Sequence, residues 1–406
     1  MPSSKGQATG GDRQWDGLPM ANSEAEPIYL DYQATTPTDP HVIEAMSSYW
    51  GIEFGNPHST KHAFGWRADE AVQQARRSIA NMINADADEI VFTSGATEAN
   101  NLAILGLLAH AKIAKARVVI STIEHKCVIQ AARQLSRLGY EVVHAPVRPS
   151  GHVDIDALEA LVDDKTALVS IMAVNNEIGT IQPIEEISRL CQRTGAVFHS
   201  DAAQAITASK IDVYHLGVDM MSLSSHKLYG PKGIGALYVS RALRDRLRPI
   251  IHGGGQEGGL RSGTLPVPLC VGFGNAADIM HDRLLVDRAS LKKNREVFLQ
   301  TLRAGIRDFK INGEEQGHPG NLNIRIPGID AEILTMNLQP RLAISTGAAC
   351  TSGIPEPSHV LRAIGLSTEE ASECVRIGFG RFTREDQARE GALLIAQAVF
   401  SLKRAI

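Results

Sequence analysis

The sequence lacks the long apolar runs from which membrane-spanning helices are built. Such a helix needs roughly 20 consecutive apolar residues, and the longest candidate, Leu102 to Ala111, is short and contains Gly106 and His110. A basic surplus is also missing, because 41 Lys and Arg face 45 Asp and Glu, for a net charge of -4. Binding to nucleic acid needs such a surplus to neutralise phosphates. The composition therefore predicts neither a membrane protein nor a dedicated nucleic-acid binder.

Cysteines are few, and none is paired in the sequence. The five lie at positions 127, 191, 270, 350 and 374, an odd number without a CxxC pair. This pattern argues against a disulfide framework and against a cysteine-based zinc site, and we expect no metal. A reducing compartment fits best. All except Cys350 lie in apolar or helical context and are predicted to be packing residues.

Residues 1–27 contain Gly, Ser, Asp, Glu and Pro with almost no apolar periodicity. Such a composition predicts disorder. The segment has no apolar core of a signal peptide, and its acidic residues outnumber Lys5 and Arg13, which makes it a weak transit peptide. We therefore expect a cytoplasmic protein, or one of the mitochondrial matrix if the source is eukaryotic.

From Ile28 onward, short β-rich runs alternate with helical patterns. Strands are predicted at 90–93, 117–121, 168–174, 197–200, 220–224 and 236–240, and helices at 66–84, 98–111 and 184–193. This alternation indicates an α/β fold with a mainly parallel sheet covered by helices. After about residue 285 a long charged helix (284–308), short strands (321–326 and 343–345) and a final helix from 385 indicate a smaller α+β domain.

Polar residues follow several of the predicted strands. Ligands bind at the carboxyl ends of strands in such sheets. The small residues of Ser94 to Glu98 open a helix whose free N–H groups suit an anion, although a simple helix cap explains them equally. Asp201 follows the strand at 197–200. Lys227 follows the strand at 220–224, and partial burial of its side chain there would lower its pKa and make the amine nucleophilic.

Together these residues meet the needs of pyridoxal phosphate (PLP). That cofactor requires a Lys for its aldehyde, an anion cradle for its phosphate and a carboxylate for its pyridine nitrogen. Asn176, after the strand at 168–174, adds an amide donor, and His125, after the strand at 117–121, adds a ring that can stack or move protons. Each feature alone favours a structural explanation, but their combination favours PLP.

A series of short motifs identifies the sequence further. In order they are Leu30-Asp31-Tyr32, Ala34-Thr35-Thr36-Pro37, Gly55-Asn56-Pro57-His58-Ser59, Thr93-Ser94-Gly95-Ala96-Thr97-Glu98, Glu124-His125-Lys126, Val174-Asn175-Asn176-Glu177-Ile178-Gly179, Asp201-Ala202-Ala203-Gln204, Ser225-His226-Lys227, Arg261-Ser262-Gly263-Thr264, Gly347-Ala348-Ala349-Cys350-Thr351-Ser352 and Arg376-Ile377-Gly378-Phe379-Gly380-Arg381-Phe382. With these motifs the chain, from Tyr29 to about Phe382, resembles class I cysteine desulfurases of the housekeeping iron–sulfur and nitrogen-fixation types.

The resemblance implies a fold-type I PLP-dependent transferase. Its large domain, with a mainly parallel seven-stranded sheet, would span residues 37–284. The small α+β domain would combine residues 28–36 with residues 285–406. It would carry the catalytic cysteine loop at about 345–358, and the longer form of this loop marks class I.

The resemblance also assigns roles to individual residues. Lys227 would bind the cofactor covalently and move protons, Asp201 would pair with the pyridinium nitrogen, and His125 would stack on the ring and assist acid–base steps. Asn176 and Gln204 would contact the ring oxygen O3′. The phosphate would be held by Ala96, Thr97, Ser224, His226 and, from a second subunit, Thr264. Arg376, with help from Asn56, would bind the substrate carboxylate.

Cys350 lies in a run of small residues, 345–353, that cannot bury much apolar area. The resemblance implies that its thiolate attacks the sulfur of L-cysteine, which leaves L-alanine and a persulfide on Cys350. A homodimer would then pass the sulfur to an acceptor or scaffold protein for iron–sulfur clusters, other thio-cofactors or tRNA thiolation.

Two alternatives stay open at this point. One is another fold-type I PLP enzyme, such as a selenocysteine lyase or an aminotransferase, which relative turnover of cysteine and selenocysteine would distinguish. The other is a catalytically silent scaffold in a sulfur-transfer complex. A colourless purified protein would favour the scaffold, whereas the presence of Lys227, Asp201, His125 and Cys350 argues against it.

Overall fold

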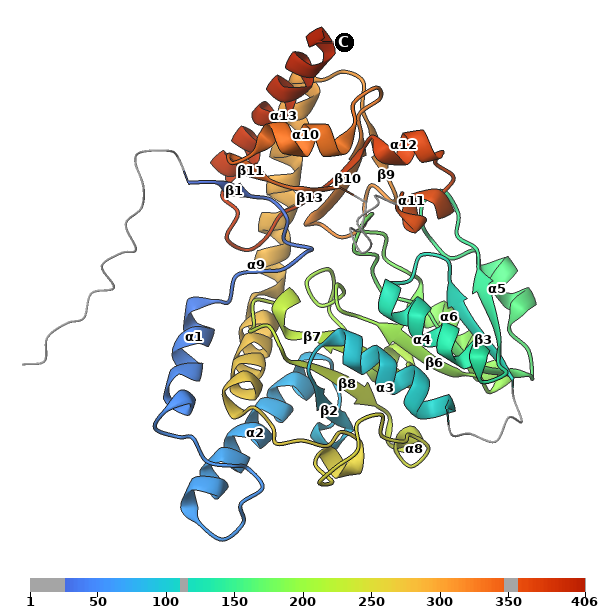
Figure 1. Cartoon of the computed structure of the whole chain (residues 1–406), viewed down its shortest axis with the longest axis vertical. Coiled ribbons are helices and arrows are strands. Elements are labelled where there is room, and N and C mark those ends of the chain that lie inside the picture. The colour runs from blue at the N-terminus through green and yellow to red at the C-terminus, as the bar shows by residue number, and fades with distance from the viewer. Residues whose placement is uncertain (1–25, 110–115, 347–356, 406) are drawn as a thin grey trace, which may run out of the picture.

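The computed structural model describes residues 26–109, 116–346 and 357–405, and its centre is a seven-stranded sheet with the strand order β2-β8-β7-β6-β5-β3-β4 (Figure 1). All neighbouring strands are parallel except β8, which is antiparallel to both β2 and β7. The strands are β2 (Ile90–Thr93), β3 (Arg117–Ser121), β4 (Glu141–Ala145), β5 (Thr166–Ser170), β6 (Val197–Asp201), β7 (Met220–Ser224) and β8 (Gly235–Val239). The expectation of an α/β fold with a mainly parallel seven-stranded sheet is confirmed.

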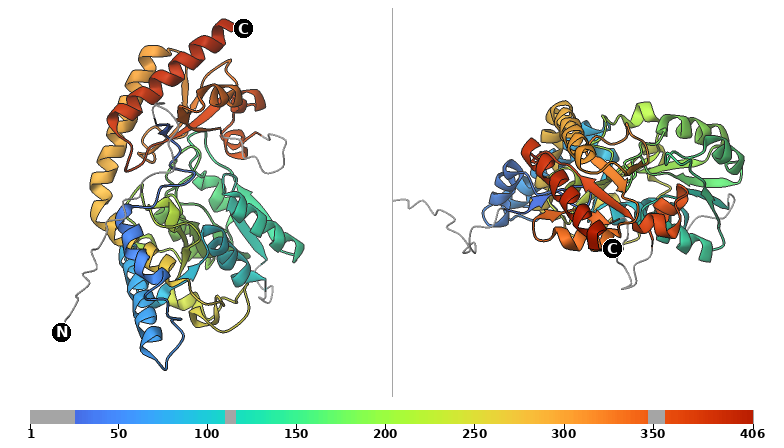
Figure 2. Two further views of the ribbon diagram at one scale, coloured as in Figure 1. Left: turned by 60° about the vertical axis from the view of Figure 1, so that its left-hand side comes forward. Right: turned by 90° about the horizontal axis from the view of Figure 1, so that it is seen from above.

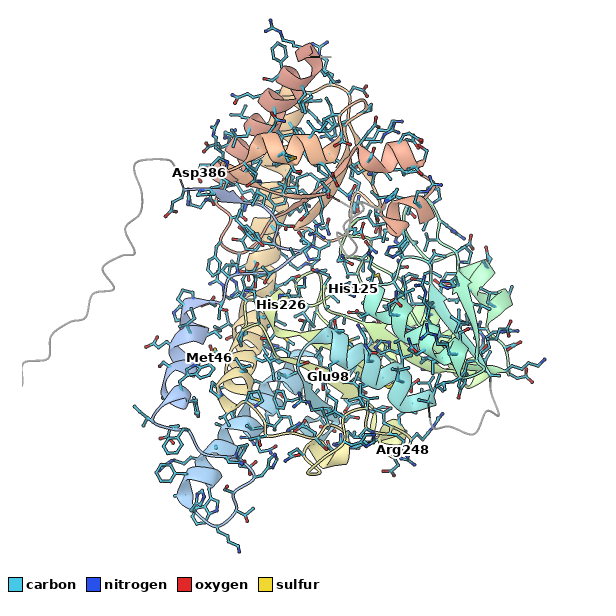
Figure 3. All side chains as sticks on the ribbon, viewed as in Figure 1. Met46, Glu98, His125, His226, Arg248 and Asp386 are labelled. Carbon is cyan, nitrogen blue, oxygen red and sulfur yellow. The ribbon has the colours of Figure 1, made fainter. Side chains whose placement is uncertain are left out.

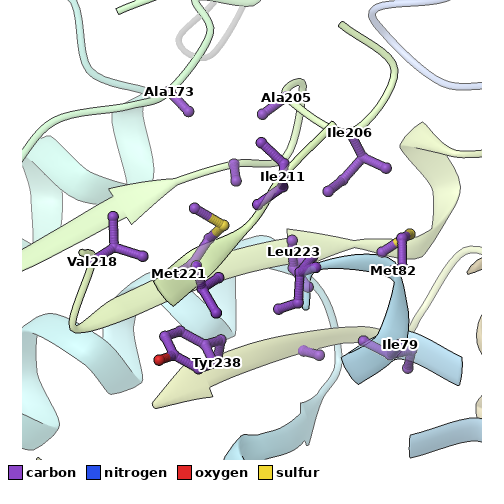
Figure 4. Close-up of a cluster of buried hydrophobic side chains, with 14 of the residues drawn as sticks. Ile79, Met82, Ala173, Ala205, Ile206, Ile211, Val218, Met221, Leu223 and Tyr238 are labelled. Carbon is purple, nitrogen blue, oxygen red and sulfur yellow. The ribbon is translucent and has the colours of Figure 1, made fainter. Parts of the chain in front are cut away.

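Helices cover both faces of this sheet, which explains its nearly continuous apolar strands. Successive residues such as Met220 and Met221 point into different cores because side chains alternate along a strand. One face packs on α3 (Ala96–Leu108) and α4 (Lys126–Arg137). The other packs mainly on α2 (Ala63–Met82), α5 (Ile155–Leu161), α6 (Ile184–Thr194) and the first half of α9 (Val267–Gly305). Figure 4 shows part of this second core around Met221, Leu223 and Tyr238.

A second, smaller sheet lies beyond the large one. It is antiparallel, with the order β12-β13-β10-β9, and a two-stranded parallel pair, β1-β11, lies in the same region. Its elements are β1 (Ile28–Tyr29), β9 (Lys310–Asn312), β10 (Asn321–Arg325), α10 (Ala331–Leu338), β11 (Leu342–Ala343), β12 (Ser345–Thr346), α11 (His359–Ala363), α12 (Thr368–Ser372), β13 (Cys374–Gly378) and α13 (Glu385–Ala405). These elements enclose a separate apolar core, with Phe298, Ile324 and Ile377 among its members.

Helix α9 joins the two regions. It has 39 residues, and its second half packs beside α13, as the turned view in Figure 2 also shows. The sequence predicted a helix only from residue 284. The first half escaped prediction because it is buried and rich in small residues rather than charged. At Gly274 an added Cβ would come within 2.5 Å of the Ala75 Cα, so this glycine permits the close approach of α9 to α2.

The remaining short elements complete the large region. They are α1 (Pro40–Ser47), η1 (Ser48–Trp50), η2 (Ala87–Glu89), α7 (Val213–Leu216), η3 (Ser225–Lys227), α8 (Arg241–Arg244) and η4 (Glu257–Gly259). Strand β5 ends at Ser170, not at Val174 as predicted, because Val174 leaves the sheet and pairs with Ile181. Strand β4 was not predicted. Within the described part of the chain no helix combines the length and apolarity needed to cross a membrane.

Candidate active site

A cavity of about 600 Å³ opens at the carboxyl edge of the large sheet, below the small sheet. The segments that follow β2, β3, β5, β6 and β7 line it, because all these strands point in the same direction. His125 and His226, both labelled in Figure 3, lie at its rim. The predicted site residues Ala96, Thr97, His125, Asn176, Asp201, Gln204, Ser224, His226 and Lys227 all line this one cavity.

The N-terminus of α3 opens into the cavity. Its N-cap is Gly95, with φ 153°, and no side chain caps the first turn. A residue with a Cβ adopts that φ rarely. An added Cβ on Gly235 of β8 would approach the Gly95 Cα to 2.6 Å, so both positions require glycine. A helix end with free N–H groups and the positive end of its dipole favours a phosphate or another anion.

Lys227 lies at the opposite side of this site, in η3 directly after β7. Its Nζ donates to the backbone carbonyl of Ala34 (2.7 Å) and to that of Gln33, in the segment that follows β1. Burial lowers the pKa of Lys227 to about 8, helped by Arg376 and opposed by Asp31 and Asp201. With such a pKa roughly a tenth of the amine is unprotonated at pH 7, far more than for an ordinary lysine, and this form is the nucleophile.

Asp201 ends β6 at the floor of the cavity and is 4% exposed. Its Oδ1 accepts from the Ala203 N–H (2.9 Å), and its Oδ2 accepts from Asn100 Nδ2 (2.6 Å). Asn100 lies on α3 and is fully buried. These two hydrogen bonds fix the orientation of the carboxylate. The site therefore places a buried carboxyl group in the same cavity as the amine of Lys227.

His125 is the N-cap of α4, and its ring faces the cavity. Its Nδ1 accepts from the Cys127 N–H (3.2 Å) and lies 2.9 Å from the Cys127 Sγ. The pKa of His125 is lowered, first by burial and then by the nearby cations Lys227 and Lys126 and by His359, against the pull of Asp201. A neutral imidazole is the form that burial favours here.

The other predicted cofactor residues line the same cavity. Gln204 is buried, and its Nε2 donates to the Gln33 carbonyl (3.0 Å). His226 Nδ1 lies 3.0 Å from Thr35 Oγ1, and burial lowers its pKa to about 4. His226 is therefore neutral, so a nearby anion would be bound by hydrogen bonds rather than by a histidine charge.

Arg376, on β13 of the small sheet, reaches toward the cavity from above. Its Nη2 contacts Asp31 Oδ1 (2.8 Å), and its Nη1 donates to the Asn176 carbonyl (3.2 Å). Its Nε is buried and has no partner among the described residues. Asp31 also accepts from Ser345 Oγ (2.7 Å) on β12. Arg376 thus has one donor without a partner, its buried Nε.

Four predicted residues are not among those that line the cavity, and one of them is Arg376, which lies next to it and bonds to the Asn176 carbonyl. Asn56 and Thr264 are both exposed and lie outside it within this single chain. Cys350 lies outside the described residues. Of the other cysteines, Cys191, Cys270 and Cys374 are buried, as predicted for packing residues. Cys127 differs from that prediction, because it lines the cavity.

Sequence reasoning missed several residues that shape the site, namely Asn100, Cys127, Asp31 and Gln33. The signal for Cys127 was its position two residues after His125, where a helix N-terminus brings residues together. Asp31 was noticed only as part of a motif. Among the described residues, no cluster of His, Cys, Asp and Glu could hold a metal ion.

Comparison with known proteins agrees with this geometry. The model of the class-V aminotransferase family matches residues 28–390. The cysteine desulfurase IscS of Rickettsia bellii is 47% identical over 378 residues, covering 93% of this chain and 92% of the relative. The cysteine desulfurase IscS of Rickettsia rickettsii is 46% identical over 386 residues, covering 95% of this chain and 94% of the relative.

Solved structures lead to the same group of proteins. A NifS-like protein superposes with a TM-score of 0.86 at 33% identity, covering 93% of this chain and all of the other. SspA in complex with cysteine superposes with a TM-score of 0.78 at 38% identity, covering 88% of this chain and 99% of the other. The chain therefore belongs to the class-V aminotransferase family and, within it, to the cysteine desulfurases, which are PLP-dependent enzymes.

Proposed function

We propose that the chain converts L-cysteine to L-alanine and keeps the sulfur as a persulfide on Cys350. The observation that carries this proposal is the arrangement of one cavity. An amine of lowered pKa (Lys227), a buried carboxylate (Asp201) and an uncapped helix N-terminus (Gly95) face the same space. Relatives named as cysteine desulfurases over more than nine-tenths of the chain support cysteine as the substrate.

The donor set of the cavity fits PLP. The free N–H groups at Ala96 and Thr97, with Ser224 and the neutral His226, suit a phosphate. Lys227 would hold the cofactor covalently, Asp201 would hold its ring nitrogen, and Asn176 and Gln204 would face O3′. When bound, PLP withdraws electrons from the substrate carbon atoms, which makes their protons acidic. Lys227 is the one buried amine among the described residues that line the cavity, so it is the one that would hold the cofactor covalently.

The residues around this space would handle the protons. The Nζ of Lys227 would take a proton from one substrate carbon and return it to another, because its pKa of about 8 lies near neutral pH. His125 would stack on the cofactor ring and assist this transfer.

Arg376 would bind the substrate carboxylate. Its guanidinium already has one carboxylate partner, Asp31, while its Nε is unpaired and buried. An arriving carboxylate would replace one of the present partners and accept from two N–H groups of the planar guanidinium.

The role of Cys350 rests on the sequence and on the described flanks of its segment. Ser345, on one flank, bonds to Asp31, and Ser358, on the other, bonds to Glu177 beside Asn176. Both ends of the segment are thus attached next to the cavity. The Cys350 thiolate would attack the substrate sulfur, so an S–S bond forms, the substrate C–S bond breaks and its electron pair stays on carbon. Proton uptake at that carbon then gives alanine.

We further propose a homodimer in which Thr264 completes the phosphate site of the partner. Exposed aromatic and apolar side chains gather on η1, the loop that follows it and the start of α2, and these are Trp50, Ile52, Phe54, Phe64 and Trp66. Exposed apolar groups on this scale mark an interaction surface. Pro57 and His58, in the same loop, line a hollow with Gln256 and Leu265, next to Thr264. An active monomer in sedimentation at assay concentration would contradict this proposal.

The acceptor of the sulfur would be a protein or RNA-modifying partner that takes sulfur for iron–sulfur clusters, thio-cofactors or tRNA thiolation. Cys350 must be a free thiol to attack the substrate sulfur, so we propose a reducing compartment, the cytoplasm or the mitochondrial matrix, where thiols stay reduced. The division into a large domain (37–284) and a small domain (28–36 with 285–406) is also part of the proposal, with α9 crossing the boundary.

The test is a single-turnover reaction of the purified protein with L-cysteine. We expect equal amounts of alanine and of a persulfide on Cys350 by mass spectrometry. Cys350→Ser should keep the cofactor but lose both products, whereas Cys191→Ala, a matched control at a buried packing cysteine, should keep them. Extra sulfur on another cysteine, or normal alanine release from Cys350→Ser, would refute the mechanism.

A further inference from the structure

Cys127 occupies an unusual position for a residue predicted only to pack. It is the second residue of α4, it is half-buried, and it lines the cavity between His125 and Thr97. Its sulfur lies 2.9 Å from His125 Nδ1 and accepts from Asn100 Nδ2 at 3.1 Å. Burial, and next the charge of Asp201, raise the pKa of this thiol to about 12. The sulfur therefore carries its proton.

The direction of that proton follows from the neighbours of the sulfur. Asn100 donates to it, and the Thr97 hydroxyl also faces it as a donor that lowers the thiol pKa. Donors on the sulfur occupy its lone pairs and leave the S–H free to donate. The nitrogen at 2.9 Å, His125 Nδ1, already accepts from the Cys127 N–H and so has its lone pair turned toward α4.

We propose that Cys127 is a positioning residue whose S–H donates to Nδ1 of His125 and thereby holds the imidazole in the neutral form with its proton on Nε2. The backbone N–H and the S–H of Cys127 then both donate to Nδ1 of His125. A proton on Nδ1 would break both contacts, so the ring offers a donor, and not a base, at Nε2. This assignment deepens the proposed function, because it rests on the proposed place of His125 beside the reacting atoms.

The same hydrogen bonds connect His125 to Asp201. Asn100 Nδ2 donates to Asp201 Oδ2 at 2.6 Å and to the Cys127 Sγ at 3.1 Å, so one amide group bridges a carboxylate and a thiol. Hydrogen bonds in such a chain polarise one another. Cys127 and Asn100 thus fix, relative to each other, His125 and Asp201, two of the groups proposed to hold the cofactor ring.

Other charged groups act on His125 from every side. Asp201 on β6 favours the imidazolium, while Lys227 in η3, His359 on α11 and Lys126 on α4 oppose it. The neighbouring Glu124 points away, with Oε1 accepting from Ser121 Oγ and from the Met172 N–H. These charges remain when Cys127 is replaced. A change in His125 that follows replacement of Cys127 therefore reports the thiol contact itself.

The experiment is ¹⁵N NMR of histidine-labelled holoenzyme over a pH series, with the His125 signals assigned from His125→Gln. We expect Nε2 to be protonated and Nδ1 unprotonated in the unmodified protein. In Cys127→Ala the pKa of His125 should rise by about half a unit to one unit, the size of one lost hydrogen bond. Cys127→Ser keeps an O–H donor and should restore most of the shift, and Cys191→Ala should produce none.

Each other outcome overturns the assignment. A proton on Nδ1 in the unmodified protein would mean that the ring donates to sulfur. A His125 pKa that stays or falls in Cys127→Ala, a Cys127→Ser variant that behaves like Cys127→Ala, or an equal shift in Cys191→Ala would each remove Cys127 from this role. The readout needs no turnover, so a failure of the proposed reaction shows separately, as absence of alanine from the unmodified protein.

Discussion

Two buried arginines five residues apart on one segment illustrate different uses of the same side chain. Arg381, 4% exposed, contacts Asp39 through Nη1 (2.9 Å) and Asp287 through Nε (2.7 Å), and its guanidinium lies over the Tyr229 ring at 4.2 Å. Arg376, 11% exposed, has one carboxylate partner, Asp31. Each guanidinium also has one buried nitrogen without a partner in the described residues, Nε of Arg376 and Nη2 of Arg381.

The difference follows from what surrounds each guanidinium. Arg381 joins the segment before α1, helix α9 and the chain after β13, so its two carboxylates tie three distant parts together. Arg376 has a single carboxylate partner and bonds to the carbonyl of Asn176, a residue that lines the cavity. Arg381 thus stabilises the joint between the two regions, whereas Arg376 is the residue proposed to bind the substrate carboxylate.

The largest effect is expected from Arg381→Ala. Two carboxylates, each 7% exposed, would lose their common cation, and breaking a buried pair in this way costs about 3–5 kcal/mol of the free energy of unfolding. Urea denaturation of the holoenzyme measures this loss. Arg376→Ala is the matched variant and should lose clearly less stability, because only one carboxylate is left behind. Equal losses would abolish the distinction.

The next effect concerns turnover. In Arg376→Ala we expect kcat/KM for L-cysteine to fall roughly 30- to 1,000-fold, the loss typical of removing one partner of a buried charge contact. Arg376→Lys should recover only part of it, because an ammonium lacks the planar fork. Steady-state alanine release provides the measurement. A normal kcat/KM in Arg376→Ala would assign the substrate carboxylate to another residue.

A third prediction concerns pH. The amine of Lys227 must be unprotonated to bond to the cofactor, so covalent capture of added PLP by cofactor-free protein should rise with pH around a midpoint near 8 rather than 10.5. Arg376 lowers this pKa, so Arg376→Ala should move the midpoint upward. The conservative Arg381→Lys, far from the amine, should leave it in place. A midpoint near 10 in the unmodified protein would contradict the burial of Lys227.

The smallest effect is expected from Asp31→Asn. Asp31 raises the pKa of Lys227 by its charge, so the neutral amide should shift the same midpoint downward, by less than one unit. The substitution keeps an oxygen that can accept from Arg376. Absorbance at several pH values follows the capture. An upward shift of the midpoint would show that Asp31 acts by holding Arg376 near the amine and not by its own charge.

The sequence by itself determined the α/β fold and most of the cavity lining. Asp201, Lys227 and the residues after Thr93 could be found because polar groups at the carboxyl ends of parallel strands meet at one sheet edge. Strand ends can be read from the apolar pattern within a few residues. The motifs then indicated the chemistry that these groups serve.

The tertiary structure alone decided which side chains meet. Asp31 and Arg376 come from strand segments 345 positions apart, and Asn100 reaches Asp201 from a different helix–strand unit. The pattern of charges does not predict the first half of α9, because close packing on α2 requires small residues there. Periodicity along the chain shows which face of an element is buried, but contacts between distant elements arise only when their faces pack together.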